Sequence, residues 1–275
     1  MFIATSLLFV PGSRPDRFAK AGASGADLTV IDLEDAVAQA DKQTARNAAL
    51  AHFADGASKG WGLRINAVDT AAGVRDLAAL LNAAALPEVL LVPMVEDVVE
   101  VELVAKALGE NCPGIIPLIE TPKGLRHAHA IAGAQNIAAM MFGGGDFSAE
   151  LGVDLAWEPL LTARQLFVHA CAEHKVPAID VPFVKLDDEA GLAEECQRAR
   201  HIGFDAKAAI HPTQIPAIEQ AFEPSEDAVN AAAEALRAYE EAGGKAIRHK
   251  GQMLEAPLVN QYRVMLARRE GKLNA

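Results

Sequence analysis

The sequence of residues 114–146 is GIIPLIETPKGLRHAHAIAGAQNIAAMMFGGGD, with an apolar run at each end and a more polar segment between them. The runs, residues 114–119 and 137–142, have the near-continuous hydrophobicity of parallel strands that are covered on both faces. Thr121 and Pro122 mark a helix start, because threonine caps helix N-termini and proline suits the first turn. The stretch therefore predicts a strand–helix–strand unit.

The same pattern recurs along the first three quarters of the chain. Eight apolar runs are found, at residues 6–10, 28–33, 62–65, 89–94, 114–119, 137–142, 178–183 and 206–210. Helices are predicted between them, including residues 96–109, which lack a clear N-cap, and residues 158–175 and 187–203. A further helix is expected after the first run, with Ser13 as its N-cap.

Eight such units predict a (β/α)₈ TIM barrel that fills residues 1–215. An open doubly wound sheet is the alternative, but its glycine fingerprint G-x-G-x-x-G is missing from the first turn, Val10-Pro11-Gly12-Ser13-Arg14. The pattern changes in residues 216–275, which we interpret as a C-terminal helical extension. It contains a charged helix at 226–242, a hairpin or flexible lid at 245–251 and an amphipathic helix at 257–269. The extension could pack on the barrel, cover its site or reach a neighbouring subunit.

Composition excludes several classes of partner. The formal net charge of −12 argues against nucleic acid and against an anionic membrane, although a local basic cluster could still bind an anionic small molecule. The sequence contains no run of 18 apolar residues, so no transmembrane helix is expected. The short apolar N-terminus resembles a strand more than a signal peptide. Three cysteines without metal-ligand spacing indicate reduced thiols, hence a cytoplasmic protein.

Active sites of TIM barrels lie at the carboxyl ends of the strands, where this sequence places many acids and arginines. Glu120 and Asp146 follow two successive buried runs, and buried carboxylates are costly without a partner. We therefore predict that they share a divalent cation. Oxygen ligands favour Mg²⁺, with Mn²⁺ possible, and disfavour zinc because no histidine accompanies the pair. His127 and His129, on the helix between the two runs, are interpreted as solvated.

Other strand-end residues have two interpretations each. Arg64 could clamp a substrate carboxylate or an enolate oxygen, or form a structural pair with Asp32 or Glu34. Gly143, Gly144 and Gly145 could bring the backbone close to a ligand, or simply permit a tight turn.

Two basic features are equally open. Arg14, with Arg17 and Lys20, could bind phosphate at the rim or lie on a solvated helix face. Lys207 could point into the barrel as a Schiff-base nucleophile, but its acidic surroundings favour a paired lysine.

The segments LFVPGSRPDRF, VIDLEDAV, LRIN, PLIETPKG, FGGGDF and AIHPTQ occur in this order between Leu8 and Gln214. Together they resemble the citrate lyase β-subunit-like branch of the HpcH/HpaI aldolase family. The resemblance implies a TIM barrel, Mg²⁺ and a lyase that breaks or forms a carbon–carbon bond in a coenzyme A thioester. The thioester would be of the citryl-CoA, malyl-CoA or citramalyl-CoA type, and the products a 2-oxo acid, such as oxaloacetate, and acetyl-CoA.

The resemblance also implies roles for individual residues. Glu120 and Asp146 would bind the metal, Arg64 the substrate, and Glu34 and Asp35 would lie beside the metal as further acids. Arg14 would lie near the CoA phosphates. Apart from the resemblance, we predict from the triple glycine that Gly145 binds substrate.

The segment KGQMLEAP resembles the family's C-terminal lid motif, with Glu255 in place of the usual catalytic aspartate, which reaches a neighbouring subunit's site. A homotrimer or hexamer is therefore expected. Two alternatives remain open: a metal-dependent aldolase that acts on free 2-oxo acids without CoA, and a non-catalytic family member.

Overall fold

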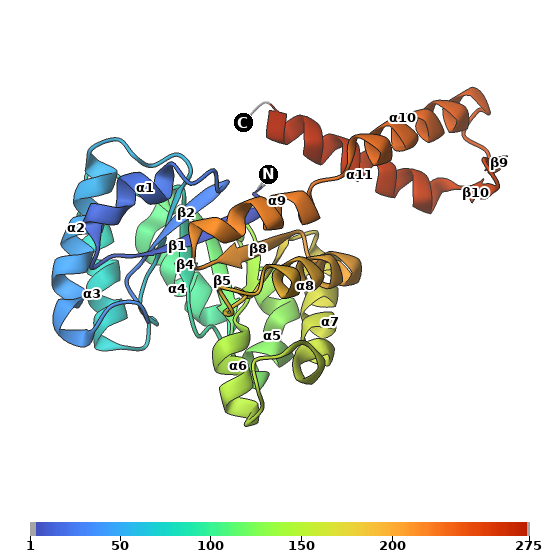
Figure 1. The fold of residues 1–275 in the computed structure, drawn as a ribbon. Coiled ribbons are helices and arrows are strands. Elements are labelled where there is room, and N and C mark those ends of the chain that lie inside the picture. Colours follow the sequence, from blue (N-terminus) through green and yellow to red (C-terminus); the bar gives the residue numbers. More distant parts are fainter. Residues whose placement is uncertain (1–3, 274–275) are drawn as a thin grey trace. The chain divides into compact units, whose positions relative to one another are not determined.

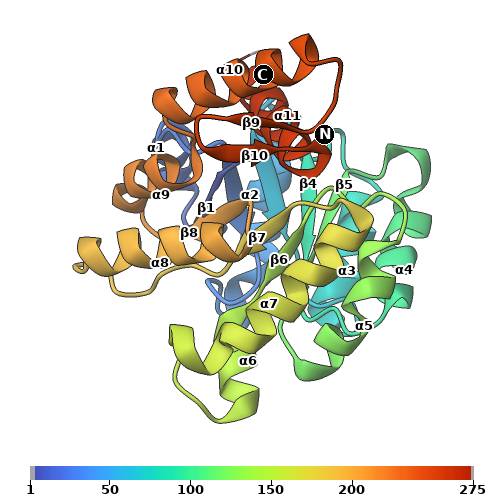
Figure 2. The same cartoon turned by 90° about the vertical axis from the view of Figure 1, so that its right-hand side faces the viewer.

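Eight parallel strands close into a barrel with helices around it, which confirms the predicted TIM barrel (Figures 1 and 2). The structure, a computed structural model, describes residues 4–273. It divides into two compact units, one up to Gln220 and one from Ala221 on, and each is described by itself. The ends of the predicted ranges 1–215 and 216–275, residues 1–3 and 274–275, lie outside the described part.

The strands follow one another around the barrel in sequence order, and β8 closes it against β1. Their bounds are β1 Ser6–Pro11, β2 Leu28–Asp32, β3 Trp61–Arg64, β4 Val89–Val92, β5 Gly114–Ile119, β6 Met140–Phe142, β7 Ala178–Asp180 and β8 Ala206–Ala209. Each of the eight predicted runs overlaps one strand. The sixth and seventh strands are only three residues long, shorter than their apolar runs.

Alternate strand residues fill the barrel interior, because side chains point to opposite faces at successive positions. Leu28 and Val30 of β2, Ile116 and Leu118 of β5, and the small Ala206 and Ala208 of β8 belong to one buried cluster. The intervening residues pack against the surrounding helices, which explains why the runs are continuously apolar.

The helices of the first unit cover the outside of the barrel (Figure 2). Their bounds are α1 Phe18–Gly22, α2 Lys42–Ala54, α3 Ala71–Leu80, α4 Val98–Leu108, α5 Pro122–Ala132, α6 Gly144–Leu151, α7 Trp157–His174, α8 Glu189–Ile202 and α9 Ile215–Phe222. Short 3₁₀ turns occur at Pro15–Arg17, Gln39–Asp41, Gly109–Asn111 and Pro212–Gln214.

The structure confirms one predicted helix N-cap and corrects the predictions for two other helix starts. Thr121 caps α5 by accepting a hydrogen bond from the backbone N–H of Gly124, as predicted. Asp97 caps α4 in a capping box with Glu100, a signal that the sequence carries and that was missed. Ser13 was wrong as a cap, because Arg14 occupies the N-cap position of a 3₁₀ turn there and makes no side-chain cap bond.

The second unit is a pair of helices, α10 Glu226–Glu241 and α11 Ala256–Leu273, joined by the hairpin β9 Ile247–His249 and β10 Gln252–Leu254. Lys250 and Gly251 form the hairpin turn with φ of 46° and 86°, as two-residue hairpin turns require. Ala235, Leu254 and Val259 form its small core.

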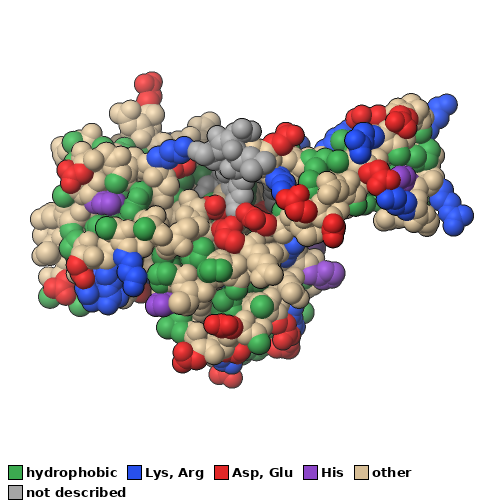
Figure 3. Space-filling model, turned by 45° about the horizontal axis from the view of Figure 1, so that its top comes forward, with side chains coloured by type: hydrophobic (Ala, Val, Ile, Leu, Met, Phe, Trp, Pro, Cys, Tyr) green, Lys and Arg blue, Asp and Glu red, His purple; other side chains and the backbone are tan. Residues whose placement is uncertain are grey.

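Acidic and basic side chains are interspersed on the face that Figure 3 shows. Within residues 4–273, no helix has both the length and the apolar character that crossing a membrane requires.

Candidate active site

A cavity of about 410 Å³ lies at the carboxyl ends of the barrel strands, where the sequence predicted the site. One group of its lining residues is charged: Asp32, Asp35, Arg64, Glu120 and Asp146. The apolar part of the wall includes Phe9, Leu118, Met141, Leu155, Val184 and Ile210. A polar centre with an apolar wall is typical of small-molecule sites.

Glu120 is the buried acid of this cavity. It follows the last residue of β5 and is 4% exposed. Its Oε2 accepts a hydrogen bond from the backbone N–H of Met94 at 2.7 Å, and Met94 has a left-handed φ of 55°. Burial raises the pKa of Glu120 to about 7, and the negative charges of Asp146 and Asp35 contribute to the rise. The site thus holds a carboxyl group whose proton a cation could displace near neutral pH.

Gly143 makes room for Glu120. Strands β5 and β6 pair with Ile119 beside Phe142, and the N–H of Gly143 donates to the carbonyl of Ile119. A Cβ atom at position 143 would lie 2.2 Å from Cγ and 2.4 Å from Oε1 of Glu120. The φ of Gly143 is −94°, so the close approach of Glu120, and not the backbone angle, requires glycine here. The sequence offered the triple glycine as a signal but did not single out this residue.

Asp146 occupies a different position from the one predicted. It lies in the first turn of α6, four residues after β6 ends, and it is exposed. It is therefore no buried strand tip, although it lines the same cavity as Glu120. Partial burial and the charge of Asp35 raise its pKa, and the helix N-terminus favours its charged form.

Arg64 is held mainly by Asp32, its neighbour in the strand register. Nε and Nη2 of Arg64 donate to the two carboxylate oxygens of Asp32 at 2.7 and 2.6 Å, and Nη1 donates to Asp35 at 3.4 Å. The Arg64 guanidinium lies 5.0 Å from the centre of the Phe9 ring, a contact that the sequence did not suggest. Burial lowers the pKa of Arg64, but Asp32 outweighs it and raises that pKa.

The predicted structural pair with Asp32 is therefore present. A guanidinium has five N–H bonds, and these three hydrogen bonds leave two for a ligand in the cavity that Arg64 lines.

Glu34 and Asp35 lie beside Arg64. Oε2 of Glu34 is 2.9 Å from Nη1 of Arg64, but this atom has no hydrogen bond of acceptable geometry and is buried. Burial raises the pKa of Glu34 to about 8, against the opposing charge of Arg64. Asp35 is exposed and lines the cavity.

The charges in and beside the cavity do not balance. Five acids, Asp32, Glu34, Asp35, Glu120 and Asp146, accompany the single guanidinium of Arg64. Burial and mutual repulsion raise the pKa of Glu34 to about 8 and that of Glu120 to about 7. A divalent cation would relieve this repulsion, and carboxylates are the ligands that Mg²⁺ and Mn²⁺ prefer. The residues present therefore fit such an ion, with Glu120 and Asp146, the predicted ligands, among the carboxylates that line the cavity.

The remaining predicted residues are spread more widely. Gly145 lines the cavity, and a Cβ there would meet no atom within 4 Å. Arg14 is exposed and paired with Asp16 through two hydrogen bonds. Glu255 is exposed between β10 and α11 of the second unit.

Lys207 does not point into the barrel. It lies between the inward Ala206 and Ala208, so it faces the helices, and it is fully buried. Its Nζ donates to Asp180 at 2.6 Å, to Glu195 of α8 at 2.8 Å and to the carbonyl of Val181. Asp180 also accepts from Arg164 of α7. Lys207 is therefore the paired lysine that the acidic surroundings favoured, and Asp180 belongs to the same buried network and not to the cavity lining.

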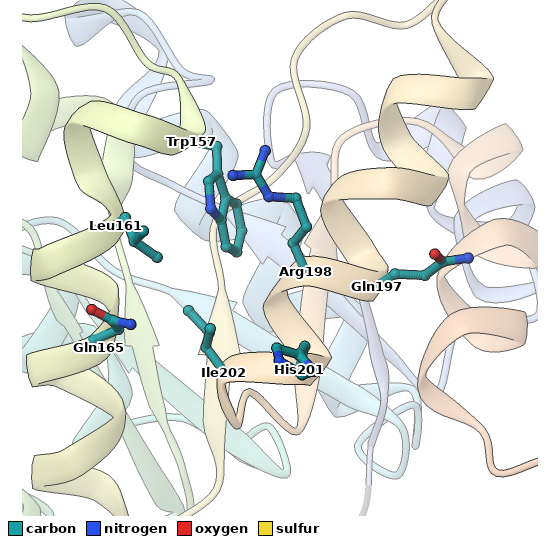
Figure 4. Close-up of a pocket in the computed structure, with 7 residues that line it drawn as sticks. All are labelled: Trp157, Leu161, Gln165, Gln197, Arg198, His201 and Ile202. Atoms are coloured by element: carbon teal, nitrogen blue, oxygen red, sulfur yellow. The ribbon is translucent and has the colours of Figure 1, made fainter.

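A second hollow, of about 440 Å³, lies between α7 and α8 (Figure 4). Trp157 and Arg198 stack there with 4.6 Å between the guanidinium carbon and the ring centre. Its described lining contains none of the predicted site residues, so it is not a rival to the cavity at the strand ends.

Comparisons with known proteins identify a family to which the chain is similar. The model of the HpcH/HpaI aldolase/citrate lyase family matches residues 5–212. The chain is 35% identical over 268 residues to a citrate lyase subunit beta-like protein of Mycobacterium tuberculosis, covering 95% of this chain and 94% of that one. It is 32% identical over 297 residues to an L-malyl-CoA/beta-methylmalyl-CoA lyase of Cereibacter sphaeroides, covering 96% and 93%.

A solved structure is similar over the same extent. The crystal structure of CitE from Mycobacterium tuberculosis in complex with magnesium, acetoacetate and coenzyme A superposes with a TM-score of 0.82 at 34% identity. The match covers 97% of this chain and 98% of that one.

Proposed function

Because the chain belongs to the HpcH/HpaI aldolase/citrate lyase family, we propose that it is a magnesium-dependent carbon–carbon lyase acting on a 3-hydroxyacyl-CoA thioester. The products would be a 2-oxo acid and acetyl-CoA. The observation that carries the proposal is the buried carboxyl of Glu120, seated against Gly143 in a cavity with an excess of acids. A relative that binds magnesium, acetoacetate and coenzyme A together supports the same ligand classes.

Glu120 and Asp146 would hold the cation. Glu120 is fixed in place by the N–H of Met94 and by the bare backbone of Gly143, whereas Asp146 is exposed and can adjust. When bound, a divalent cation supplies Lewis acidity to the substrate oxygens. Mg²⁺ would suffice, and Mn²⁺ could replace it because both accept oxygen ligands.

The proposed reaction breaks one carbon–carbon bond and moves two protons. The hydroxyl of the substrate loses its proton and becomes the carbonyl of the 2-oxo acid, while the bond to the α-carbon of the thioester breaks. The electron pair of that bond passes to the thioester, which becomes an enolate, and a proton then completes acetyl-CoA.

Arg64 would stabilise the enolate oxygen with its two remaining N–H groups. Its bidentate pair of hydrogen bonds with Asp32 fixes the guanidinium before substrate binds, so little reorganisation is needed during the reaction. Oε2 of Glu34 lies 2.9 Å from Nη1 of the same guanidinium.

Two carboxylates would move protons. Asp35 lines the cavity and would accept the hydroxyl proton. Glu255 would protonate the enolate carbon, as the lid aspartate of the family does at the matching position. Glu255 is exposed in the second unit, which leaves its carboxylate available for proton transfer.

The coenzyme A part of the substrate needs separate contacts. We propose that Arg14, exposed on the loop after β1, binds the CoA phosphates and that Gly145 lets the substrate approach the start of α6. The pair of Arg14 with exposed Asp16 is worth little in water, so phosphate can compete for the guanidinium.

The first experiment measures release of 2-oxo acid from malyl-CoA, citramalyl-CoA and citryl-CoA, with Mg²⁺ and with a chelator. We expect turnover of one or more thioesters that chelation abolishes. Glu120→Gln should lose Mg²⁺ binding by calorimetry, while Glu150→Gln, exposed on α6 outside the cavity lining, should keep it. Full turnover by Glu120→Gln, or in the presence of chelator, would refute the metal role.

Calorimetry with CoA separates the alternatives. A lyase acting on thioesters should bind CoA, and Arg14→Ala should weaken that binding. An aldolase for free 2-oxo acids would show no CoA binding and would turn over 4-hydroxy-2-oxo acids. A non-catalytic member would bind Mg²⁺ and CoA without turning over any thioester of the panel.

The proposal extends to assembly and location. A lid residue that serves a neighbouring site requires a homo-oligomer, a trimer or a hexamer, which light scattering would detect. A cytoplasmic location is proposed from the cysteines, since Cys112, Cys171 and Cys196 are all free thiols. Fractionation of the source cells would test it.

A further inference from the structure

His129, Glu173 and His174 form a cluster outside the proposed active site. His129 lies in the last turn of α5, and Glu173 and His174 are the last two residues of α7. Each offers one ligand atom, and these three atoms lie within 4.8 Å of one another. The side chains are 53%, 61% and 33% exposed. Two imidazoles and one carboxylate are a donor set that zinc uses, with water in the remaining position.

Two nitrogen–oxygen distances in the cluster are within 1 Å of the ligand separation in a zinc site. Nδ1 of His129 lies 2.7 Å from one carboxylate oxygen of Glu173, and Nε2 of His174 lies 4.0 Å from the other. Zinc bonds of about 2.0–2.1 Å at tetrahedral angles place two ligand atoms about 3.3 Å apart. The first pair would have to open and the second to close by well under 1 Å, which exposed side chains can do by small rotations.

The surrounding backbone favours a cation and orients one ligand. Both α5 and α7 end at the cluster, and the C-terminus of a helix carries partial negative charge. The ring of His174 lies against Gly133, where a Cβ would be 2.8 Å from its Cε1. The absence of a side chain at position 133, the residue that caps α5, therefore lets this imidazole lie beside the end of α5.

The cluster is at the opposite end of the barrel from the cavity. The helices α5 and α7 pack against each other and lie side by side in Figures 1 and 2. Each ends shortly before the strand that follows it, β6 or β7, begins, so the cluster lies at the amino ends of the strands. Its nitrogen donors also differ from the oxygen donors of the cavity.

We propose that His129, Glu173 and His174 bind a borderline transition-metal ion, Zn²⁺ above all, and that this ion joins α5 to α7. The ion would lie between His129 and Glu173 and would draw in His174. Mg²⁺ would not bind there, because it prefers an all-oxygen set. The site is independent of the proposed lyase function, since none of its ligands lines the cavity.

The test titrates Zn²⁺ alone into the full chain by calorimetry, in excess Mg²⁺ so that the oxygen-rich cavity is occupied by its own ion. The variants are His129→Ala, His174→Ala and the control His169→Ala, an exposed histidine on the same helix α7. Absorption of bound Co²⁺ in the visible range reports the same site through its ligands. Thermal unfolding with and without Zn²⁺ reports the link between α5 and α7.

We expect wild type and His169→Ala to bind one Zn²⁺ per chain and to unfold at higher temperature with the ion. Loss of a ligand should weaken binding at least as much as loss of a supporting residue does, roughly 10–100-fold, in both His129→Ala and His174→Ala. Equal binding by all four proteins would overturn the proposal, as would a wild type that binds no Zn²⁺ while Mg²⁺ is present. Because the side chains of His129 and Glu173 are more than half exposed and that of His174 is one-third exposed, the variants should fold, and unchanged unfolding without zinc would verify it.

Discussion

Replacing Gly143 by alanine tests the architecture of the candidate site more sharply than removing a ligand does. The new Cβ would lie 2.2 Å from Cγ of Glu120, whereas an ordinary contact is 3.4 Å or more. Glu120 would have to retreat by the difference, 1.2 Å, although the N–H of Met94 holds its carboxylate at 2.7 Å. A displacement of about 1 Å at a catalytic group can cost on the order of a hundredfold in rate.

We therefore expect Gly143→Ala to lose about a hundredfold in kcat/KM, together with a large loss of Mg²⁺ affinity. Overpacking of this kind costs about 1–3 kcal/mol of folding free energy, so the variant should still fold at room temperature. Calorimetry with Mg²⁺, and Mn²⁺ binding by electron paramagnetic resonance, measure the affinity, and circular dichroism measures the fold.

Gly145→Ala is the matched control, two residues away in the same triple glycine. A Cβ there meets nothing within 4 Å, and the position is helical, where alanine is favoured. It should keep wild-type metal affinity, although its methyl group would protrude toward the cavity. If Gly143→Ala binds Mg²⁺ as tightly as Gly145→Ala does, Glu120 is not held as we argue.

Further outcomes concern Glu120, Arg64 and Lys207. Burial raises the pKa of Glu120 to about 7. Mg²⁺ affinity, measured by calorimetry across pH, should therefore rise by up to about tenfold per pH unit toward pH 7 and level off above it. An affinity that does not change with pH would contradict this. In the cation-free protein the same carboxyl binds its proton more tightly folded than unfolded, so its contribution to stability is present below its ordinary pKa and is lost as pH rises to about 7. Arg64→Lys should lower kcat/KM by about 10²–10³, because an ammonium cannot reproduce the bidentate pair with Asp32, and an unchanged rate would exclude Arg64 from enolate stabilisation. Lys207→Met should cost about 3–5 kcal/mol in urea unfolding, because Asp180 loses a buried partner, and borohydride should trap no adduct of a 2-oxo acid on wild-type Lys207.

Several features of the fold and the site could be predicted from local patterns. The continuous apolar runs identify buried parallel strands, and the regular spacing of eight of them identifies the barrel. Thr121-Pro122 identifies the start of α5. Glu120, directly after a long buried strand, is recognisable as a costly carboxylate and is indeed buried in the cavity.

Other features depend on which face a residue occupies. Lys207 faces the helices because the pleat of β8 places Ala206 and Ala208 in the barrel interior. The sequence of a short strand does not determine which of its two alternating sets of side chains points inward. Asp146 was expected at a strand tip, but β6 ends at Phe142 and α6 begins at Gly144, so a helix carries it. Its neighbouring glycines gave no sign of how soon the helix would begin.

The sequence alone determined that a TIM barrel carries acids at the carboxyl ends of its strands, since burial periodicity and residue type are local properties. Only the tertiary structure decided which of those groups meet. Asp32 faces Arg64 because β2 and β3 pair in that register, and Glu120 lies on Gly143 because Ile119 pairs with Phe142. His129 likewise meets Glu173 and His174 only because α5 packs on α7. These encounters join residues far apart in the chain, and barrel closure and strand register, which no local pattern specifies, set their distances.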